Sequence, residues 1–166
     1  MARMVSELPP HDPALFAVDW AGERRSENWF DIGRDYTERW HHQMQIRDGV
    51  GASGLLDARW VLPLLDLSVR CLPRSYADVD ASRDRSVALY VSISTDAVWT
   101  LRSEQNAWRV WRGAARSPTT IVRLDPDTAW RMFFNALPAA SARRRAAVEG
   151  DQALAEPLFA ARAVMV

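Results

Sequence analysis

The hydrophobic pattern of this chain changes near residue 86. Before it, residues 26–49 place apolar side chains at helical spacing; after it, short segments alternate or are rich in β-branched and aromatic residues. Helices repeat every 3.6 residues and strands every two, so the change predicts helix first and sheet second. We therefore expect an α+β fold: a long N-terminal helix, then a small α/β sandwich with a mainly antiparallel sheet. The predicted strands are 86–93, 97–104, 107–114 and 119–125.

Turn residues and prolines divide the rest of the chain. Residues 1–25 hold three prolines and are expected to be irregular. The long helix is expected to begin at Ser26 as N-cap and to end at the glycines that follow it, and a short apolar helix within 60–72 is expected to begin at Pro63. The short connections between the strands predict an antiparallel meander. A helix over 126–137, a strand over 144–151 and a closing helix over 151–166, capped by Asp151, complete the prediction.

Composition excludes several classes of function. Acidic and basic residues balance at 21 each, whereas nucleic-acid binding usually needs a basic excess. No apolar run approaches the ~18 residues that span a bilayer, so no membrane insertion is expected. No apolar leader is visible, which with a single cysteine favours the cytoplasm. That cysteine, Cys71, lies in an apolar segment and is interpreted as buried and structural. All basic residues are arginines, which excludes lysine chemistry.

The long helix has two contrasting faces. Its apolar stripe, interpreted as the buried face, comprises Trp29, Ile32, Tyr36, Trp40 and Met44. The opposite side holds Asp31, Asp35, Glu38 and His42. Glu38 and His42 stand four residues apart, so their side chains can reach one divalent cation, but a zinc centre needs three or four ligands. From the residues alone, this side is either a solvated acidic face or a set of metal ligands, with His11 a candidate third donor.

Several stretches in order resemble the actinobacterial mycothiol-dependent maleylpyruvate isomerases. They are VDWAGERRSENWFDIGRD, YTERWHHQMQIRDGVG, WTLRSEQNAWRVWRGA, LDPDTAWRMF and VEGDQALAEPLF. That family joins a DinB-like metal-binding four-helix bundle to a sterol-carrier-protein-like domain. The resemblance implies a partial DinB-like segment at 1–55, a linker with a short helix at 56–85, and a sterol-carrier-like domain at 86–166.

The resemblance also implies a site. The family's Glu-x-x-x-His pair of metal ligands matches Glu38 and His42, while Gln45 stands where the family often has an aspartate. The family's early helix, with a further histidine, has no counterpart here, so the long helix is expected to be the remnant of a four-helix bundle. A homodimer could complete that bundle.

Two functions remain open at this point. The first is a thiol-dependent isomerase or transferase, in which a divalent metal such as zinc activates mycothiol, a small thiol, for attack on a small organic substrate. The second is a non-catalytic sterol-carrier-like module that binds an apolar ligand or a full-length relative. Three tryptophans of the predicted sheet, Trp99, Trp108 and Trp111, are interpreted as core residues. The alternative is that an exposed aromatic side chain beside Arg109 or Arg112 stacks on a flat ligand.

Overall fold

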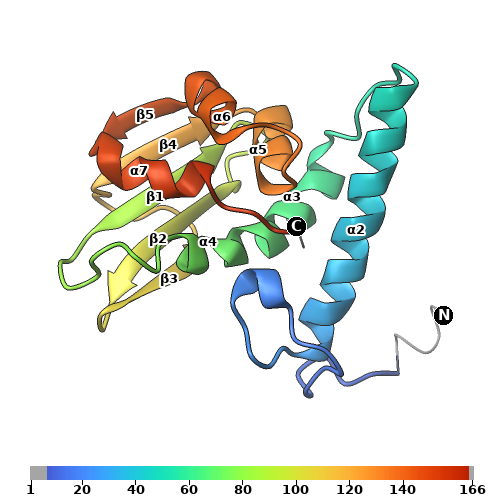
Figure 1. Ribbon diagram of the computed structural model, residues 1–166, viewed down its shortest axis with the longest axis horizontal. Coiled ribbons are helices and arrows are strands. Elements are labelled where there is room, and N and C mark those ends of the chain that lie inside the picture. The colour runs from blue at the N-terminus through green and yellow to red at the C-terminus, as the bar shows by residue number, and fades with distance from the viewer. Residues whose placement is uncertain (1–6, 165–166) are drawn as a thin grey trace.

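One mixed sheet of five strands forms the C-terminal half of the computed structural model, which describes residues 7–164 (Figure 1). The strand order is β3-β2-β1-β4-β5. All neighbours are antiparallel except β1 and β4, which run parallel. The strands are β1 (Ser86–Val91), β2 (Val98–Glu104), β3 (Ala107–Arg112), β4 (Thr120–Leu124) and β5 (Ala147–Gly150).

The predicted meander is therefore confirmed only as far as β3. Gln105 and Asn106 both have positive φ angles, of 51° and 61°, which is the geometry of a tight two-residue hairpin between β2 and β3. The seven-residue segment 113–119 makes no such turn and instead carries the chain across the sheet, so that β4 pairs with β1. Alternation along β4 indicates a strand but does not specify its neighbour, which is why the sequence did not predict this crossover.

Helices lie at all four predicted positions, but the helices predicted over 126–137 and 151–166 end early, at Phe133 and Phe159, and the helix over 139–145 was not predicted. Residues 165–166 of the predicted closing helix lie outside the described residues. The helices are α2 (Asn28–Gly49), α3 (Ala58–Ser68), α4 (Leu72–Ser75), α5 (Pro126–Phe133), α6 (Ala139–Arg145) and α7 (Gln152–Phe159), with 3₁₀ turns η1 (Asp19–Ala21) and η2 (Val69–Cys71). Asp151 caps α7 as expected, accepting a hydrogen bond from the Leu154 N–H at 3.1 Å. The predicted strand over 144–151 is shorter, because α6 occupies its first residues.

Two predicted helix starts are wrong. Ser26 does not cap α2: Glu27 is the N-cap residue, while the Ser26 hydroxyl accepts a hydrogen bond from the Val18 N–H at 2.9 Å. Pro63 does not begin α3 but lies inside it, because the Asp57 carboxylate caps the helix by accepting from the Arg59 N–H. The Asp57 cap satisfies an otherwise free N–H group and so favours the start of α3 there, whereas Glu27 makes no side-chain cap bond at the start of α2.

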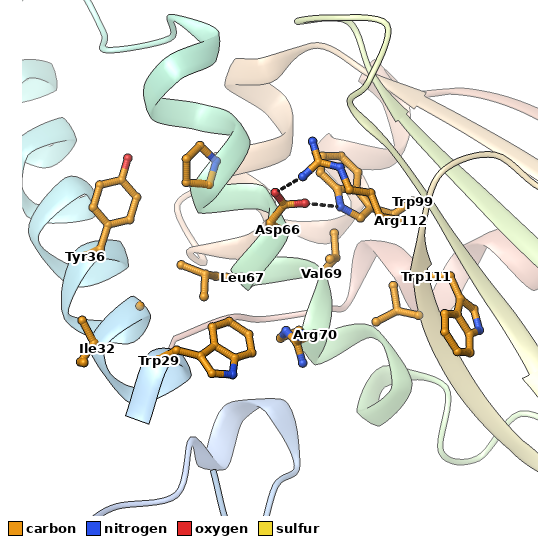
Figure 2. Close-up of a pocket in the computed structure, with 13 residues that line it drawn as sticks. Trp29, Ile32, Tyr36, Asp66, Leu67, Val69, Arg70, Trp99, Trp111 and Arg112 are labelled. Atoms are coloured by element: carbon orange, nitrogen blue, oxygen red, sulfur yellow. Dashed lines mark hydrogen bonds and ion pairs between the residues drawn. The ribbon is translucent and has the colours of Figure 1, made fainter. Parts of the chain in front are cut away.

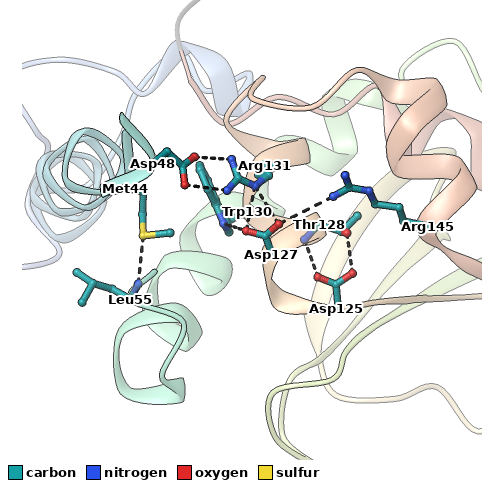
Figure 3. Close-up of polar contacts among 9 residues, drawn as sticks. All are labelled: Met44, Asp48, Leu55, Asp125, Asp127, Thr128, Trp130, Arg131 and Arg145. Carbon is teal, nitrogen blue, oxygen red and sulfur yellow. Dashed lines mark hydrogen bonds and ion pairs between the residues drawn. The ribbon is translucent and has the colours of Figure 1, made fainter. Parts of the chain in front are cut away.

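Helix α2 lies along α3 at the edge of the molecule (Figure 1). The two helices approach closely at Gly33, where an added Cβ would lie 2.5 Å from Cδ2 of Leu67. Near its C-terminal end, α2 is joined to α5 by two hydrogen bonds from the Arg131 guanidinium to the Asp48 carboxylate, at 2.6 and 3.0 Å (Figure 3). These contacts position α2 beside the sheet domain.

The apolar stripe of α2 is buried along only part of its length. Trp40 and Met44 belong to the core, where the Trp40 ring meets the Trp130 ring edge to face at 5.4 Å between centroids. Trp29, Ile32 and Tyr36 are only half-buried. No helix within residues 7–164 is long and apolar enough to cross a membrane. The half-buried N-terminal part of the stripe faces the cavity described next.

Candidate ligand-binding site

A cavity of about 630 Å³ lies between α2, α3 and the β2–β3 side of the sheet (Figure 2). Helix α2 contributes one wall, α3 and η2 the second, and strands β2 and β3 the third. The lining residues are Trp29, Ile32, Gly33, Tyr36, Pro63, Asp66, Leu67, Val69, Arg70, Trp99, Val110, Trp111 and Arg112. Three of these thirteen residues are charged, namely Asp66, Arg70 and Arg112, and the other ten are aromatic, aliphatic or glycine. The lining is therefore mainly apolar and aromatic.

Hydrogen bonds hold the aromatic side chains of α2 in place. The Tyr36 hydroxyl donates to the Trp60 carbonyl oxygen at 2.6 Å, which joins α2 to α3. The indole N–H of Trp29 donates to the Glu27 carboxylate at 2.6 Å. Partial burial raises the pKa of the Tyr36 hydroxyl, so this group stays a neutral donor. The wall that α2 contributes is thus preorganised, because its two large rings are held from their polar ends.

Asp66 connects the second and third walls. Its carboxylate accepts a hydrogen bond from the indole N–H of Trp99 at 2.8 Å and forms an ion pair with the Arg112 guanidinium (Figure 2). The Trp99 ring is buried, so its N–H needs this partner. The charges of Asp66 and Arg112 compensate one another, and these residues brace the cavity wall without adding net charge to it.

Arg70 places a positively charged guanidinium in the lining of the cavity. Its guanidinium lies over the rings of Trp29 and Phe30, 4.6 and 5.1 Å from their centroids. Within residues 7–164 no carboxylate forms an ion pair with it. Glu27 is near, and its pKa is lowered chiefly by hydrogen bonds from His11 and Trp29, with a smaller contribution from Arg70. A stacked guanidinium keeps its in-plane N–H donors free for another acceptor.

The predicted metal ligands lie on the opposite side of α2 from this cavity lining. The distance between Nε2 of His42 and Oε2 of Glu38 is 3.9 Å, and both side chains are exposed to solvent. Nδ1 of His42 lies 2.9 Å from the Gln45 side-chain oxygen, so Gln45 orients the imidazole. The structure thus brings the pair together at the spacing that the sequence predicted.

A third donor is not supplied by His11. Its Nδ1 lies 2.9 Å from the Glu27 carboxylate at the N-terminal end of α2, roughly four helical turns from His42. No group of three or more His, Cys, Asp or Glu side chains within residues 7–164 is arranged to hold a metal ion. Glu38 and His42 are therefore two donors where zinc takes three or four, and their metal binding stays a prediction.

Cys71 and the three tryptophans of the sheet differ in burial. Cys71 is buried, and burial raises the pKa of its thiol, which agrees with a structural role. Trp99 and Trp108 are buried as expected, but the prediction for Trp111 is wrong, since this side chain is 54% exposed. It lies on the outermost strand of the sheet, which within the described residues has one neighbour only, and it borders the cavity.

Sequence reasoning missed two of the three charged residues of the lining, Asp66 and Arg70. Both lie in the apolar segment 60–72, where each is the only residue of its charge. A lone charge in a buried helix is unusual unless it is paired or has a binding role, and this was the signal that could have drawn attention to them.

Comparisons with known proteins give structural likeness only. No protein-family model matches the sequence, and a search of curated proteins found no relative. Among solved structures, palmitated SCP2L2 from Aedes aegypti is 18% identical, with a TM-score of 0.43 over 55% of this chain and 87% of that one. The crystal structure of sterol carrier protein 2 like 2 from Aedes aegypti is 18% identical, with a TM-score of 0.42 over 57% of this chain and 93% of that one.

A third similar structure is the sterol carrier protein domain 2 of Helicoverpa armigera. It is 13% identical, with a TM-score of 0.41 over 60% of this chain and 93% of that one. The chain is thus similar to sterol carrier protein 2 domains over part of its length. None of these matches concerns the maleylpyruvate isomerases or the DinB-like bundle, so those parts of the resemblance stay predictions.

Proposed function

We propose that this protein is a binding module for a small apolar or amphiphilic ligand, held in the cavity between α2, α3 and the sheet. One observation carries the proposal: a space of about 630 Å³ is lined mainly by aromatic and aliphatic side chains. Ligand pockets in proteins are typically about 300–1,000 Å³ with few polar groups. Burying an apolar ligand there removes its surface from water, which supplies about 25 cal/mol per Å².

The polar groups of the cavity favour a ligand with one acidic end. Asp66 and Arg112 are paired with one another, whereas Arg70 has no such partner within residues 7–164. An acidic group can accept hydrogen bonds from the guanidinium of Arg70 while the apolar part of the ligand contacts Trp29 and Val110. An amphiphile with a carboxylate therefore fits better than a hydrocarbon of the same size.

The test is a titration with cis-parinaric acid, a fluorescent polyene carboxylate, in wild type and two matched variants. Ile32→Trp places a larger side chain in the cavity, and Ile46→Trp makes the same change on an exposed part of α2 that does not line it. We expect Ile32→Trp to weaken binding at least about tenfold, or ~1.4 kcal/mol, and Ile46→Trp to change it less than about twofold. Equal affinity of Ile32→Trp and wild type would refute the proposal.

A second titration isolates the role of Arg70. Wild type is expected to bind cis-parinaric acid more tightly than its methyl ester, and Arg70→Gln is expected to bind both alike. Arg59→Gln is the matched control, because Arg59 also lies over a tryptophan, Trp60, but outside the cavity. If wild type does not distinguish acid from ester, Arg70 does not select an acidic ligand, although the cavity can still bind the apolar part.

The metal- and mycothiol-dependent isomerase stays a second candidate, supported by the 3.9 Å approach of Glu38 and His42 on one exposed face. These two donors do not by themselves make up a zinc site, and we assign no catalytic step to them. A second copy of the chain would have to supply the further donors. Zinc titration calorimetry with wild type and His42→Ala tests this: tight binding of one zinc per two chains, lost in the variant, is expected. If wild type does not bind zinc, or if His42→Ala binds it as tightly as wild type, this candidate is excluded.

A further inference from the structure

A second cavity, of about 600 Å³, lies between three segments that are far apart in the sequence. Its lining comes from η1, from the η2–α4 region and from the chain after α7. Two arginines border it, and unlike Arg112 in the ligand cavity described above, neither forms an ion pair with a carboxylate of the lining. The proposal below does not depend on the ligand cavity. The lining residues are Asp19, Trp20, Cys71, Arg74, Ser75, Ala160, Arg162 and Val164.

Neither arginine is neutralised by a carboxylate within residues 7–164. Arg162 donates to the Asn135 side-chain oxygen at 2.9 Å and to the carbonyl oxygens of Phe159 and Ala161 at 3.0 and 2.7 Å. Arg74 donates to the backbone carbonyl oxygen of Asp19. These neutral acceptors fix both guanidinium groups in position and leave their positive charges without a counterion.

Hydrogen-bond donors also remain available on both side chains. A guanidinium carries five N–H donors, and the bonds above occupy only some of them on either arginine. The one acidic residue of the lining is Asp19, so the two arginines leave the cavity with an excess of one positive charge.

Trp20 provides an independent observation at the same cavity. Its side chain is 5% exposed, and its indole N–H is buried with no hydrogen-bond partner in the described part of the chain. Because this N–H has almost no accessible surface, the Trp20 ring borders the cavity while its N–H lies beneath the cavity wall. The ring is therefore a reporter of what enters the cavity.

We propose that this cavity is a binding site for a small organic oxyanion, held by the guanidinium groups of Arg74 and Arg162 beside the Trp20 ring. Planar guanidinium groups match the geometry of carboxylate and phosphate oxygens, which accept hydrogen bonds but cannot donate them when ionised. The cavity is larger than a bare phosphate ion requires, so it has room for the organic part of a phosphate ester or a dicarboxylate.

The experiment follows the indole N–H resonances of ¹⁵N-labelled protein by NMR during titration at constant ionic strength. The probes are glycerol 3-phosphate and succinate, which distinguish a phosphate ester from a carboxylate source, and Trp20→Phe assigns the Trp20 resonance. We expect one of the two anions to shift this resonance saturably. The exposed Trp60, which lies outside the cavity, serves as the internal control and should not shift.

Charge-removing variants complete the test. Arg74→Gln is expected to weaken binding at least about tenfold and to fold normally, because Arg74 is exposed and its one described bond is to a carbonyl oxygen. Arg144→Gln is the matched control, since the side chain of this exposed arginine bonds Ser141 and no other described residue, and it lies outside the cavity. A Trp20 resonance that neither anion moves, or that moves equally in wild type and Arg74→Gln, would overturn the proposal.

Discussion

The close approach of α2 to α3 makes a sharp prediction at Gly33. An added Cβ at this position would lie 2.5 Å from Cδ2 and 3.1 Å from Cδ1 of Leu67, whose side chain is only 8% exposed. Carbon atoms in contact are normally about 3.5–4.0 Å apart, so Gly33→Ala must displace either Leu67 or the helix. Because Leu67 also lines the apolar cavity, this contact determines the position of one of its walls.

Two opposing terms set the size of the effect. Alanine in a helix interior is favoured over glycine by about 1 kcal/mol, whereas overpacking a well-packed contact costs about 1–3 kcal/mol. Gly33→Ala should therefore lower the free energy of unfolding by up to about 2 kcal/mol. In a Leu67→Ala background, which itself costs about 2–5 kcal/mol, the clash is gone and the same change should stabilise by about 1 kcal/mol. The two substitutions should thus couple by about 1–3 kcal/mol.

Urea denaturation of wild type, both single variants and the double variant measures this coupling. Gly49→Ala is the matched control, because Gly49 is in the same helix but an added Cβ there meets nothing within 4 Å. That variant should be as stable as wild type or more stable, by up to about 1 kcal/mol. A coupling below about 0.5 kcal/mol between Gly33 and Leu67 would refute the packing that we describe.

Three further predictions concern the core and the contact between α2 and α5. Hydrogen bonds from Arg131 hold the pKa of Asp48 below its ordinary value of 3.8, so this pair stabilises the fold above about pH 4 and its contribution is lost as the pH falls. In urea denaturation, wild type should therefore lose more unfolding free energy than Asp48→Asn between roughly pH 6 and roughly pH 3. The Cys71 thiol is buried and its pKa is raised, so a disulfide reagent should modify it only as fast as the protein unfolds; modification of the folded protein within seconds would contradict this. Tyr76→Phe should cost about 0.5–1.5 kcal/mol in urea, because the buried hydroxyl donates to the Leu154 carbonyl oxygen at 2.7 Å; an unchanged midpoint would show that this bond adds nothing.

Local sequence patterns were sufficient to predict secondary structure wherever residues close in the chain determine it. The helix over residues 28–49, the strand positions and the cap at Asp151 all follow from short-range periodicity and hydrogen bonding. The pairing of Glu38 with His42 followed in the same way, since residues four apart in a helix always share a face. The burial of Cys71 was also predictable, because its whole segment is apolar.

Contacts between distant segments decided the rest. Asp66 and Arg112, which form an ion pair, lie 46 residues apart in the sequence. Arg70 stacks on Trp29, which lies in a different helix. Hydrophobic periodicity identifies which face of an element is apolar, but it does not identify what will cover that face. The sequence by itself therefore determined the order and the amphipathic faces of the elements. The tertiary structure alone decided that β4 pairs with β1, that Trp111 stays exposed, and that half of the α2 stripe borders a cavity, because each depends on the packing of elements that are not adjacent in the chain.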